Sequence, residues 1–251
     1  MNQLAKTILF TRLDEAIDLY TSLPAESAIE KIQQNPIQWT YLYRVNDYSI
    51  RLLDTAYLLT KIAKQAKNIL GQSYLQVIGF DEVEYFDYCV QNFYIRLVTT
   101  YDIMLLLCSN LYNLGLDDKD VKENHITKNL LYKNLDPSEN LKKYRDLIRP
   151  IRNKRNLIVH RGFLSNEDIN EFLHQKNKSN IKKDHSLFDS QGFERFKNEE
   201  LKKIKQLLFN SNKILTEFGN SCGAHFWPYF NSIKYFKDDT SNDIINLTSR
   251  D

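Results

Sequence analysis

The chain contains only seven glycines and five prolines in 251 residues. Because these two residue types end or interrupt regular elements, their scarcity leaves long stretches in which one periodicity continues without a break. Apolar residues make up 42% of the chain and charged residues 26%, so the chain can bury a sizeable core. The sequence therefore predicts a largely α-helical globular protein, an all-α fold.

The N-terminal half shows apolar residues at helical spacing. We expect two antiparallel helices over residues 3–22 and 26–35, followed by a long helix over 46–70 that Gly71 ends. The apolar stripe expected on the first helix comprises Leu4, Ile8, Leu13, Ile17 and Leu19. The stripe expected on the long helix comprises Ile50, Leu53, Tyr57, Leu58 and Ile62.

The longest expected helix covers residues 81–114 and is nearly apolar all round at 104–107, so it is expected to form the centre of the core. Acidic residues open it, and Gly115 is its expected C-cap. A shorter polar helix is expected over 117–134.

A well-marked helix start follows, with Asp136 as N-cap and Pro137 at the first helical position. Pro150 is expected to kink or break this helix, whose second piece runs to Arg161 before Gly162 stops it. We expect a short helix and a mobile loop over 165–190, an amphipathic helix over 193–218, and a frayed polar tail after residue 237.

The cysteines and most histidines give no sign of a metal site. Cys89, Cys108 and Cys222 are far apart in the sequence, and we expect buried free thiols. Four histidines lie in polar or loop surroundings without a repeated ligand spacing, so neither zinc nor another cofactor is expected. These histidines are His125, His174, His185 and His225.

The hydropathy pattern contains no apolar run near the length of about 20 residues that spans a bilayer. The first six residues also lack the apolar segment of a secretory signal. We expect a cytoplasmic protein that does not contact a membrane.

Positive charge is concentrated between residues 141 and 161. The whole chain carries only +2, whereas this segment has eight basic residues against the single acid Asp146, a local charge of +7. Two interpretations are open: a solvated helix face, or a phosphate-binding surface whose cations are held by a packed helix. The basic residues are Lys142, Lys143, Arg145, Arg149, Arg152, Lys154, Arg155 and Arg161.

The end of this segment joins three side chains of complementary chemistry. At about 100° per residue, Asn156 and His160 lie one turn apart on one face, with Arg155 beside them. Histidine is the natural acid or base near neutral pH, arginine supplies a permanent forked cation, and the amide can orient either. This set suits RNA cleavage by the 2′-hydroxyl without a metal.

The pattern Arg155-Asn156-Leu157-Ile158-Val159-His160 resembles the Arg-x(4–6)-His motif of the HEPN superfamily, and the resemblance covers about residues 80–218. It implies a helical-bundle homodimer in which two motifs form one composite ribonuclease site. By the same resemblance, Arg155 would neutralise the scissile phosphate, Asn156 would position His160 or RNA, and His160 would be the acid or base.

Further positions are expected to assist this site. Arg149, Arg152, Lys154 and Arg161 are expected to bind RNA phosphates. Arg96 and Asp102 on the long core helix are expected to support the motif helix, although a structural ion pair with other residues is an equal alternative.

One position departs from the family pattern. HEPN toxins that are paired with nucleotidyltransferase antitoxins have a tyrosine two residues after the histidine, where this chain has Gly162. Control by modification of that tyrosine is therefore not expected here. His160 also has a purely structural interpretation, in which it bonds the last carbonyls of its helix.

We accordingly expect an N-terminal helical extension over 1–75, a HEPN-like bundle over 80–236 and a polar tail over 237–251. The leading hypothesis is a metal-independent endoribonuclease, a toxin or effector of a prokaryotic antiviral defence or toxin–antitoxin system. Its expected partners are RNA, a second copy of the chain, and an antitoxin or regulatory protein. The alternatives are a non-catalytic HEPN-like module that binds RNA, a nucleotide or a protein, and a structural helical protein.

Overall fold

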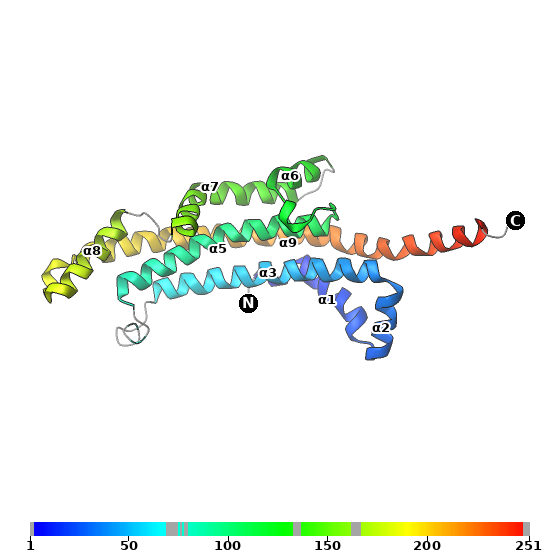
Figure 1. The fold of residues 1–251 in the computed structure, drawn as a ribbon, viewed down its shortest axis with the longest axis horizontal. Helices are drawn as coiled ribbons and strands as arrows, with labels where there is room; N and C mark the ends of the chain where they lie inside the picture. The colour runs from blue at the N-terminus through cyan, green and yellow to red at the C-terminus, as the bar shows by residue number, and fades with distance from the viewer. Residues whose placement is uncertain are drawn as a thin grey trace. The chain divides into compact units, whose positions relative to one another are not determined.

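The computed structural model describes residues 3–68, 75, 77, 80–132, 137–161 and 167–247. Side chains at 131–132, 154, 157–161, 167–168 and 234–247 lie outside this description. Every regular element in the described part is a helix, so the all-α prediction is confirmed (Figure 1). The elements are η1 (Gln3–Lys6), α1 (Ile8–Thr21), α2 (Ala25–Gln34), α3 (Pro36–Lys67), α5 (Glu82–Leu111), η2 (Asp118–Asp120), α6 (Glu123–Tyr132), α7 (Pro137–Arg161), α8 (Glu167–Lys182), η3 (His185–Leu187) and α9 (Ser190–Leu247).

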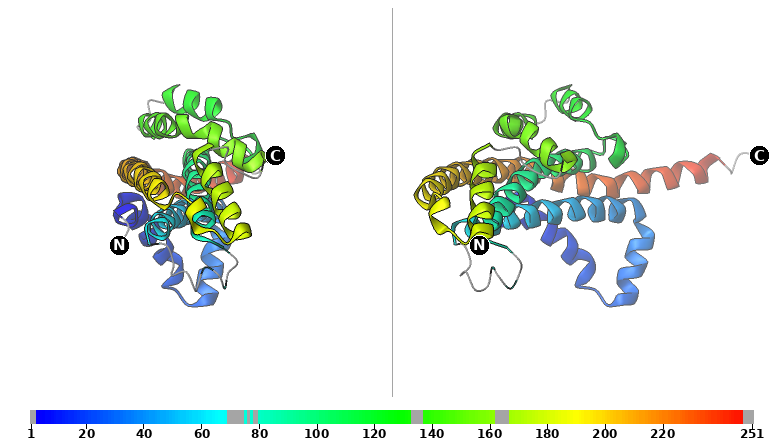
Figure 2. Two further views of the ribbon diagram at one scale, coloured as in Figure 1. Left: turned by 90° about the vertical axis from the view of Figure 1, so that its left-hand side faces the viewer. Right: turned by 60° about the vertical axis from the view of Figure 1, so that its left-hand side comes forward.

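These helices form two compact units, and each unit is assembled from separate stretches of the chain. Figure 2 draws the same helices from two further sides. The first unit takes described residues from 1–53, 103–142 and 214–251, and the second takes those from 54–102 and 143–213. The sequence-based division is of another kind, because it separates an N-terminal extension from a HEPN-like bundle near residues 75–80. That division stays a prediction.

In the first unit, α1 lies directly against α9. The backbone N–H of Ile8 donates to Oδ1 of Asn220 at 3.1 Å, so a side chain of α9 caps the first turn of α1. A Cβ at Gly223 would lie 2.3 Å from the backbone nitrogen of Leu9. Glycine is therefore required at 223 for this approach of the two helices.

A buried polar chain joins α1, α3 and α9 in the same unit. Tyr20 donates to Oε1 of Gln38 at 3.0 Å, and Nε2 of Gln38 donates to the carbonyl of Phe230 at 2.9 Å. Tyr41 donates to the carbonyl of Leu111 at 2.9 Å. Each buried donor is thus satisfied, which lets these polar groups lie inside the core.

The first apolar stripe was predicted only in part. Thr7 separates η1 from α1, and the helix after it buries Leu9, Phe10, Leu13, Ala16 and Tyr20. Ile8 and Leu19, which we expected on the buried face, are exposed.

The stripe predicted for α3 is largely wrong. The helix begins at Pro36, ten residues earlier than expected, and its buried positions include Val45, Leu52, Ala56 and Leu59. Ile50 and Tyr57 are 47% and 60% exposed. Apolar residues occur on more than one face of α3, and spacing alone does not say which face meets the core.

Both ends of α5 are fixed by local hydrogen bonds. At its start, Asp81 and Glu84 form a capping box with two reciprocal bonds of 2.9 Å. At its end, Leu114 N–H bonds the carbonyl of Ser109 at 3.0 Å, and Asn113 adopts a left-handed φ of 44°. This pattern is a Schellman motif in which Asn113 is the left-handed residue. We expected Gly115 in that role, and Gly115 lies two residues further on.

The C-terminal helices are longer than predicted. Pro150 does not break α7, which continues through it to Arg161. The expected mobile loop is replaced by the second half of α8 and by η3, whose N-cap Asp184 accepts from the N–H of Ser186. α9 also runs through Pro228 to Leu247, so residues 238–247 are helical where a frayed tail was expected.

The second unit has an aromatic core with a buried carboxylate. Phe193 meets Phe86 edge to face, with ring centroids 6.0 Å apart. Glu200 is buried, accepts a hydrogen bond from Tyr94, and pairs with Nζ of Lys203 at 3.0 Å. The carboxylate is therefore compensated by two partners rather than left unpaired.

The three cysteines are free and buried, as predicted. Burial raises the pKa of Cys89 to about 11, and burial together with the neighbouring Cys108 raises the pKa of Cys222 well above its usual value. The thiols of Cys89 and Cys222 therefore stay protonated near neutral pH and act as small apolar side chains.

Asp87 on α5 makes the second unit sensitive to pH. Burial raises its pKa from 3.8 to about 6, although Nε2 of Gln91 donates to one carboxylate oxygen at 2.5 Å. The other oxygen, Oδ1, is buried without a hydrogen bond within the described residues. Because the folded state binds this proton more tightly than the unfolded chain, the group's contribution to stability falls between about pH 4 and pH 6 as pH rises.

We expect Asp87→Asn to raise the free energy of unfolding at pH 7 by about 1–3 kcal/mol, and to change it little at pH 4. Urea unfolding of both proteins at several pH values measures this difference. Asp54→Asn, at an exposed position on α3, is the control and should give no such trend. Equal stability of Asp87→Asn and the parent at pH 7 would contradict the expectation.

Candidate functional site

The basic segment lies on α7, and one face of this helix is anchored in the protein. Tyr144, Ile148 and Ile151 are buried and follow one another at helical spacing. Arg155 comes four residues after Ile151 and seven after Ile148, so it continues the same stripe. The first motif residue therefore occupies a core-facing register of its helix.

Tyr144 fastens α7 to two neighbouring helices of the second unit. Its hydroxyl donates to the carbonyl of Leu97 on α5 at 3.2 Å and lies 3.0 Å from the hydroxyl of Ser211 on α9. Burial raises the pKa of Tyr144 to about 12. A neutral phenol with two partners in the core gives this part of α7 a defined position.

Arg152 rests on an aromatic platform. Its guanidinium carbon lies 5.5 Å from the ring centroid of Tyr101. Tyr101 in turn stacks on Tyr144, with ring centroids 6.3 Å apart and an angle of 6° between the planes. The cation–π contact, together with the stacking of the two rings, fixes the position of the Arg152 guanidinium beside α5.

Arg155 and Asn156 are in direct contact. Arg155 is half-buried, and its Nη1 donates to Oδ1 of Asn156 at 3.2 Å. Its Nε is buried and has no hydrogen bond within the described part of the chain. Asn156 is exposed. The pair thus joins a partly desolvated guanidinium to an accessible amide, an arrangement that can bind an anion by several N–H donors.

Asp146 offsets part of the local positive charge. It forms an ion pair with Nη2 of Arg149 and lies 3.6 Å from Nε of Arg145. Arg149 is largely exposed, so this pair is readily exchanged for a phosphate contact. The positive charge of α7 thus lies partly on the surface, at Arg149, and partly on the anchored Arg152 and Arg155.

Three of the predicted site side chains lie outside the described residues. They belong to Lys154, His160 and Arg161. The backbone of α7 is helical to Arg161, which places positions 156 and 160 one turn apart, as the spacing predicts. The structure therefore brings Arg155 and Asn156 together, and the placement of the His160 side chain stays a prediction.

Neither Arg96 nor Asp102, the two positions expected to support the motif helix, is fully buried. Asp102 is exposed and Arg96 is half-buried. Because adjacent residues on a helix point about 100° apart, the burial of Tyr101 turns Asp102 away from the core. The support of α7 by Arg96 and Asp102 stays a prediction. Tyr101 and Tyr144 also support this helix, and their apolar periodicity marks them only as core.

Within the described ranges, no group of three or more metal-ligating residues comes together. In the same part of the chain, no helix has the length and apolar character to cross a membrane.

The described part of the chain is thus an all-helical module with one cationic helix, α7, which is anchored on one side and carries an arginine–amide pair near its end. The chain is a member of the HEPN superfamily: it matches the Cthe2314-like HEPN family over residues 44–221, more than half of its length. The match begins well before residue 80, where we expected the resemblance to start. No curated protein and no solved structure shows a significant match.

Proposed function

We propose that this HEPN protein is a metal-independent endoribonuclease in which Arg155, Asn156 and His160 act on RNA. The observation that supports it most is the Arg155–Asn156 pair on an anchored basic helix, inside the part of the chain that matches the HEPN family. A guanidinium with a buried Nε and a fixed register suits a phosphate that gains charge during the reaction.

In the proposed reaction, a phosphoryl group is transferred within the RNA from a 5′-oxygen to the adjacent 2′-oxygen. The 2′-hydroxyl oxygen attacks the adjacent phosphorus, and the bond from phosphorus to the 5′-oxygen breaks. The products are a 2′,3′-cyclic phosphate and a 5′-hydroxyl. One proton leaves the 2′-oxygen and one reaches the 5′-oxygen, and His160 exchanges one of these. Arg155 binds the non-bridging oxygens, and Asn156 orients Arg155 or the RNA.

Arg149, Arg152, Lys154 and Arg161 bind neighbouring phosphates in this proposal. Such contacts add affinity without reading the sequence of the RNA, and they make binding depend on salt. Of these, Arg152 is the one whose guanidinium is held against an aromatic ring, that of Tyr101.

Each chain carries half of the proposed site, and a homodimer brings two copies of the motif together. A role as toxin or effector in a prokaryotic defence or toxin–antitoxin system, with an antitoxin or regulatory partner, is the biological setting that family membership suggests. A protein that is monomeric in light scattering at the concentrations used for cleavage would contradict the composite site.

The experiment is incubation of the pure protein with mixed RNAs in EDTA, followed by analysis of the product ends. We expect fragments with 2′,3′-cyclic phosphate and 5′-hydroxyl ends. Binding without cleavage would favour the second candidate, a non-catalytic HEPN module, for which the same basic face of α7 is the supporting observation. Cleavage that requires an added divalent metal would contradict the proposed chemistry.

A further inference from the structure

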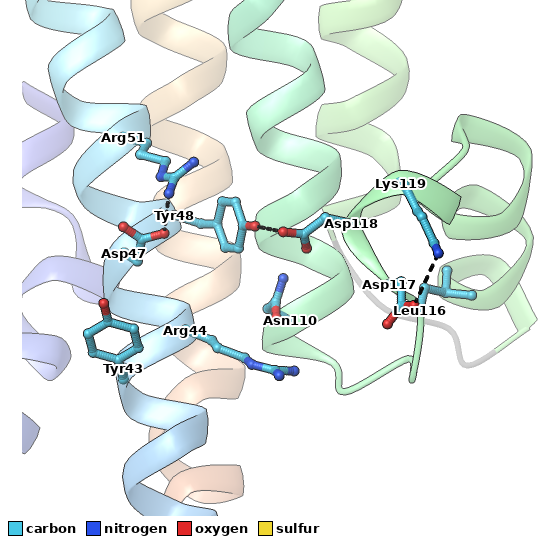
Figure 3. Close-up of a pocket in the computed structure, with 10 residues that line it drawn as sticks. All are labelled: Tyr43, Arg44, Asp47, Tyr48, Arg51, Asn110, Leu116, Asp117, Asp118 and Lys119. Atoms are coloured by element: carbon cyan, nitrogen blue, oxygen red, sulfur yellow. Dashed lines mark hydrogen bonds and ion pairs between the residues drawn. The ribbon is translucent and has the colours of Figure 1, made fainter.

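A pocket of about 650 Å³ opens in the first unit between α3, the end of α5 and the segment 116–119 (Figure 3). Its volume lies in the range of small-molecule sites, which is roughly 300–1,000 Å³. None of the residues proposed for RNA cleavage lines it. The charged side chains that line it are Arg44, Asp47, Arg51, Asp117, Asp118 and Lys119.

One wall of the pocket is held in place by its own contacts. Nη2 of Arg51 pairs with Asp47 at 2.9 Å, and its guanidinium lies 5.2 Å from the ring centroid of Tyr48. Tyr48 donates a hydrogen bond to Asp118, which joins α3 to η2. Burial and this bond raise the pKa of Tyr48 to about 12, so the phenol keeps its proton. This wall of the pocket is therefore preformed rather than made on binding.

Two cations remain available at the pocket. Arg44 is exposed and forms no ion pair within the described part of the chain. Figure 3 shows its guanidinium extending beneath Asn110 into the space between α3 and the 116–119 segment. Lys119 lies 3.9 Å from Asp117, but both side chains are 79% exposed, so this contact is weak. A forked guanidinium and an ammonium from separate elements suit a phosphate group.

The other lining groups suit the rest of a nucleoside. Tyr43 is 64% exposed beside Arg44 and offers an aromatic face on which a planar base can stack. Nδ2 of Asn110 donates to the carbonyl of Leu106 at 2.9 Å, which leaves its Oδ1 as an acceptor. Asp117 adds a carboxylate at the rim. These acceptors match the N–H and O–H groups of a base and a ribose, whereas a bare anion gains nothing from them.

We propose that this pocket binds a nucleoside phosphate, with Arg44 and Lys119 on the phosphate and Tyr43 against the base. The site is separate in its residues from the motif on α7. Its occupancy can be measured whether or not the protein cleaves RNA.

Calorimetric titration of the full chain with nucleoside mono-, di- and triphosphates tests this, with inorganic phosphate, pyrophosphate and unphosphorylated nucleosides as comparisons. We expect a nucleotide to bind at least tenfold more tightly than any of these comparisons. Arg44→Ala should weaken that binding by about tenfold or more, and Tyr43→Ala by several-fold.

The matched control is Lys61→Ala, which removes an exposed cation elsewhere on α3 and should leave nucleotide binding unchanged. Because both Arg44 and Tyr43 are exposed, their variants should stay folded, and a circular dichroism melt checks this. RNA cleavage measured on the same proteins separates the two proposals, since Arg44→Ala should cleave RNA at the parent rate.

Three outcomes would overturn the proposal. They are the absence of nucleotide binding, binding of inorganic phosphate as tight as that of any nucleotide, and nucleotide binding that survives Arg44→Ala undiminished.

Discussion

Arg155→Ala is expected to slow RNA cleavage about a hundredfold to a thousandfold, the usual loss when one preorganised donor to a developing charge is removed. The side chain is held by its core-facing register on α7 and by its bond to Asn156. A mobile cation from solution therefore replaces it poorly. Rates of cleavage of a labelled RNA, measured with substrate below and above saturation, give the loss in kcat and in kcat/KM separately.

His160→Ala is expected to lose at least as much, because proton transfer by a placed side chain contributes about a hundredfold to ten-thousandfold. The double variant should lose little more than either single variant if the two residues act in one step. Arg155→Lys keeps the charge but not the fork, so it should recover only part of the rate.

Arg195→Ala is the matched control, since it removes an exposed arginine from α9 of the same unit. It should cleave at the parent rate. If Arg155→Ala stays within about threefold of the parent while remaining folded, the assignment of Arg155 to the chemistry is wrong.

Gly223→Ala is expected to lower the free energy of unfolding by about 2 kcal/mol or more, the cost of overpacking a closed contact. Inside a helix, a change from glycine to alanine ordinarily raises the free energy of unfolding by about 0.5–1 kcal/mol. The change expected at position 223 therefore has the opposite sign to the one that helix propensity predicts. The cause is that the new methyl group would lie 2.3 Å from the nitrogen of Leu9 and 2.5 Å from the carbonyl carbon of Ile8. Backbone at the start of α1 cannot rotate away as a side chain could.

Urea unfolding gives the change in stability of Gly223→Ala, and an unchanged slope of the transition shows that the exposed area is the same. Ala224→Gly at the adjacent exposed position calibrates the propensity, with an expected loss of about 1 kcal/mol. A Gly223→Ala protein as stable as the parent would mean that α1 and α9 do not meet as closely as 2.3 Å implies.

The candidate site was predictable only where its features are local. Helical spacing and residue chemistry alone indicated the motif at 155–160 and the concentration of charge on α7. The support of Arg152 by Tyr101 and Tyr144 was not predictable, because a ring on one helix and a cation on another are related only by packing. Likewise the exposure of Asp102 on α5 was not predictable, and its support of the motif helix stays a prediction.

The pocket at Arg44 had no counterpart in the sequence. Its walls come from α3, from the end of α5 and from the 116–119 segment. The residues of α3 that line it are far in the sequence from those of the other two elements. The hydrogen bond from Tyr48 to Asp118 joins these segments in the folded protein. No spacing rule connects two residues that are separated by 70 positions.

By itself the sequence determined the helical class, the approximate order of the helices, the burial of the three free cysteines and membership of the HEPN superfamily. Each of these depends on composition or on residues within a few turns of one another. The tertiary structure decided which face of α3 is buried, how far α7 and α9 extend through their prolines, and why residue 223 is glycine. Those outcomes depend on contacts between distant segments. The sequence of a helix indicates which faces could be buried, and packing against its neighbours decides which face is buried.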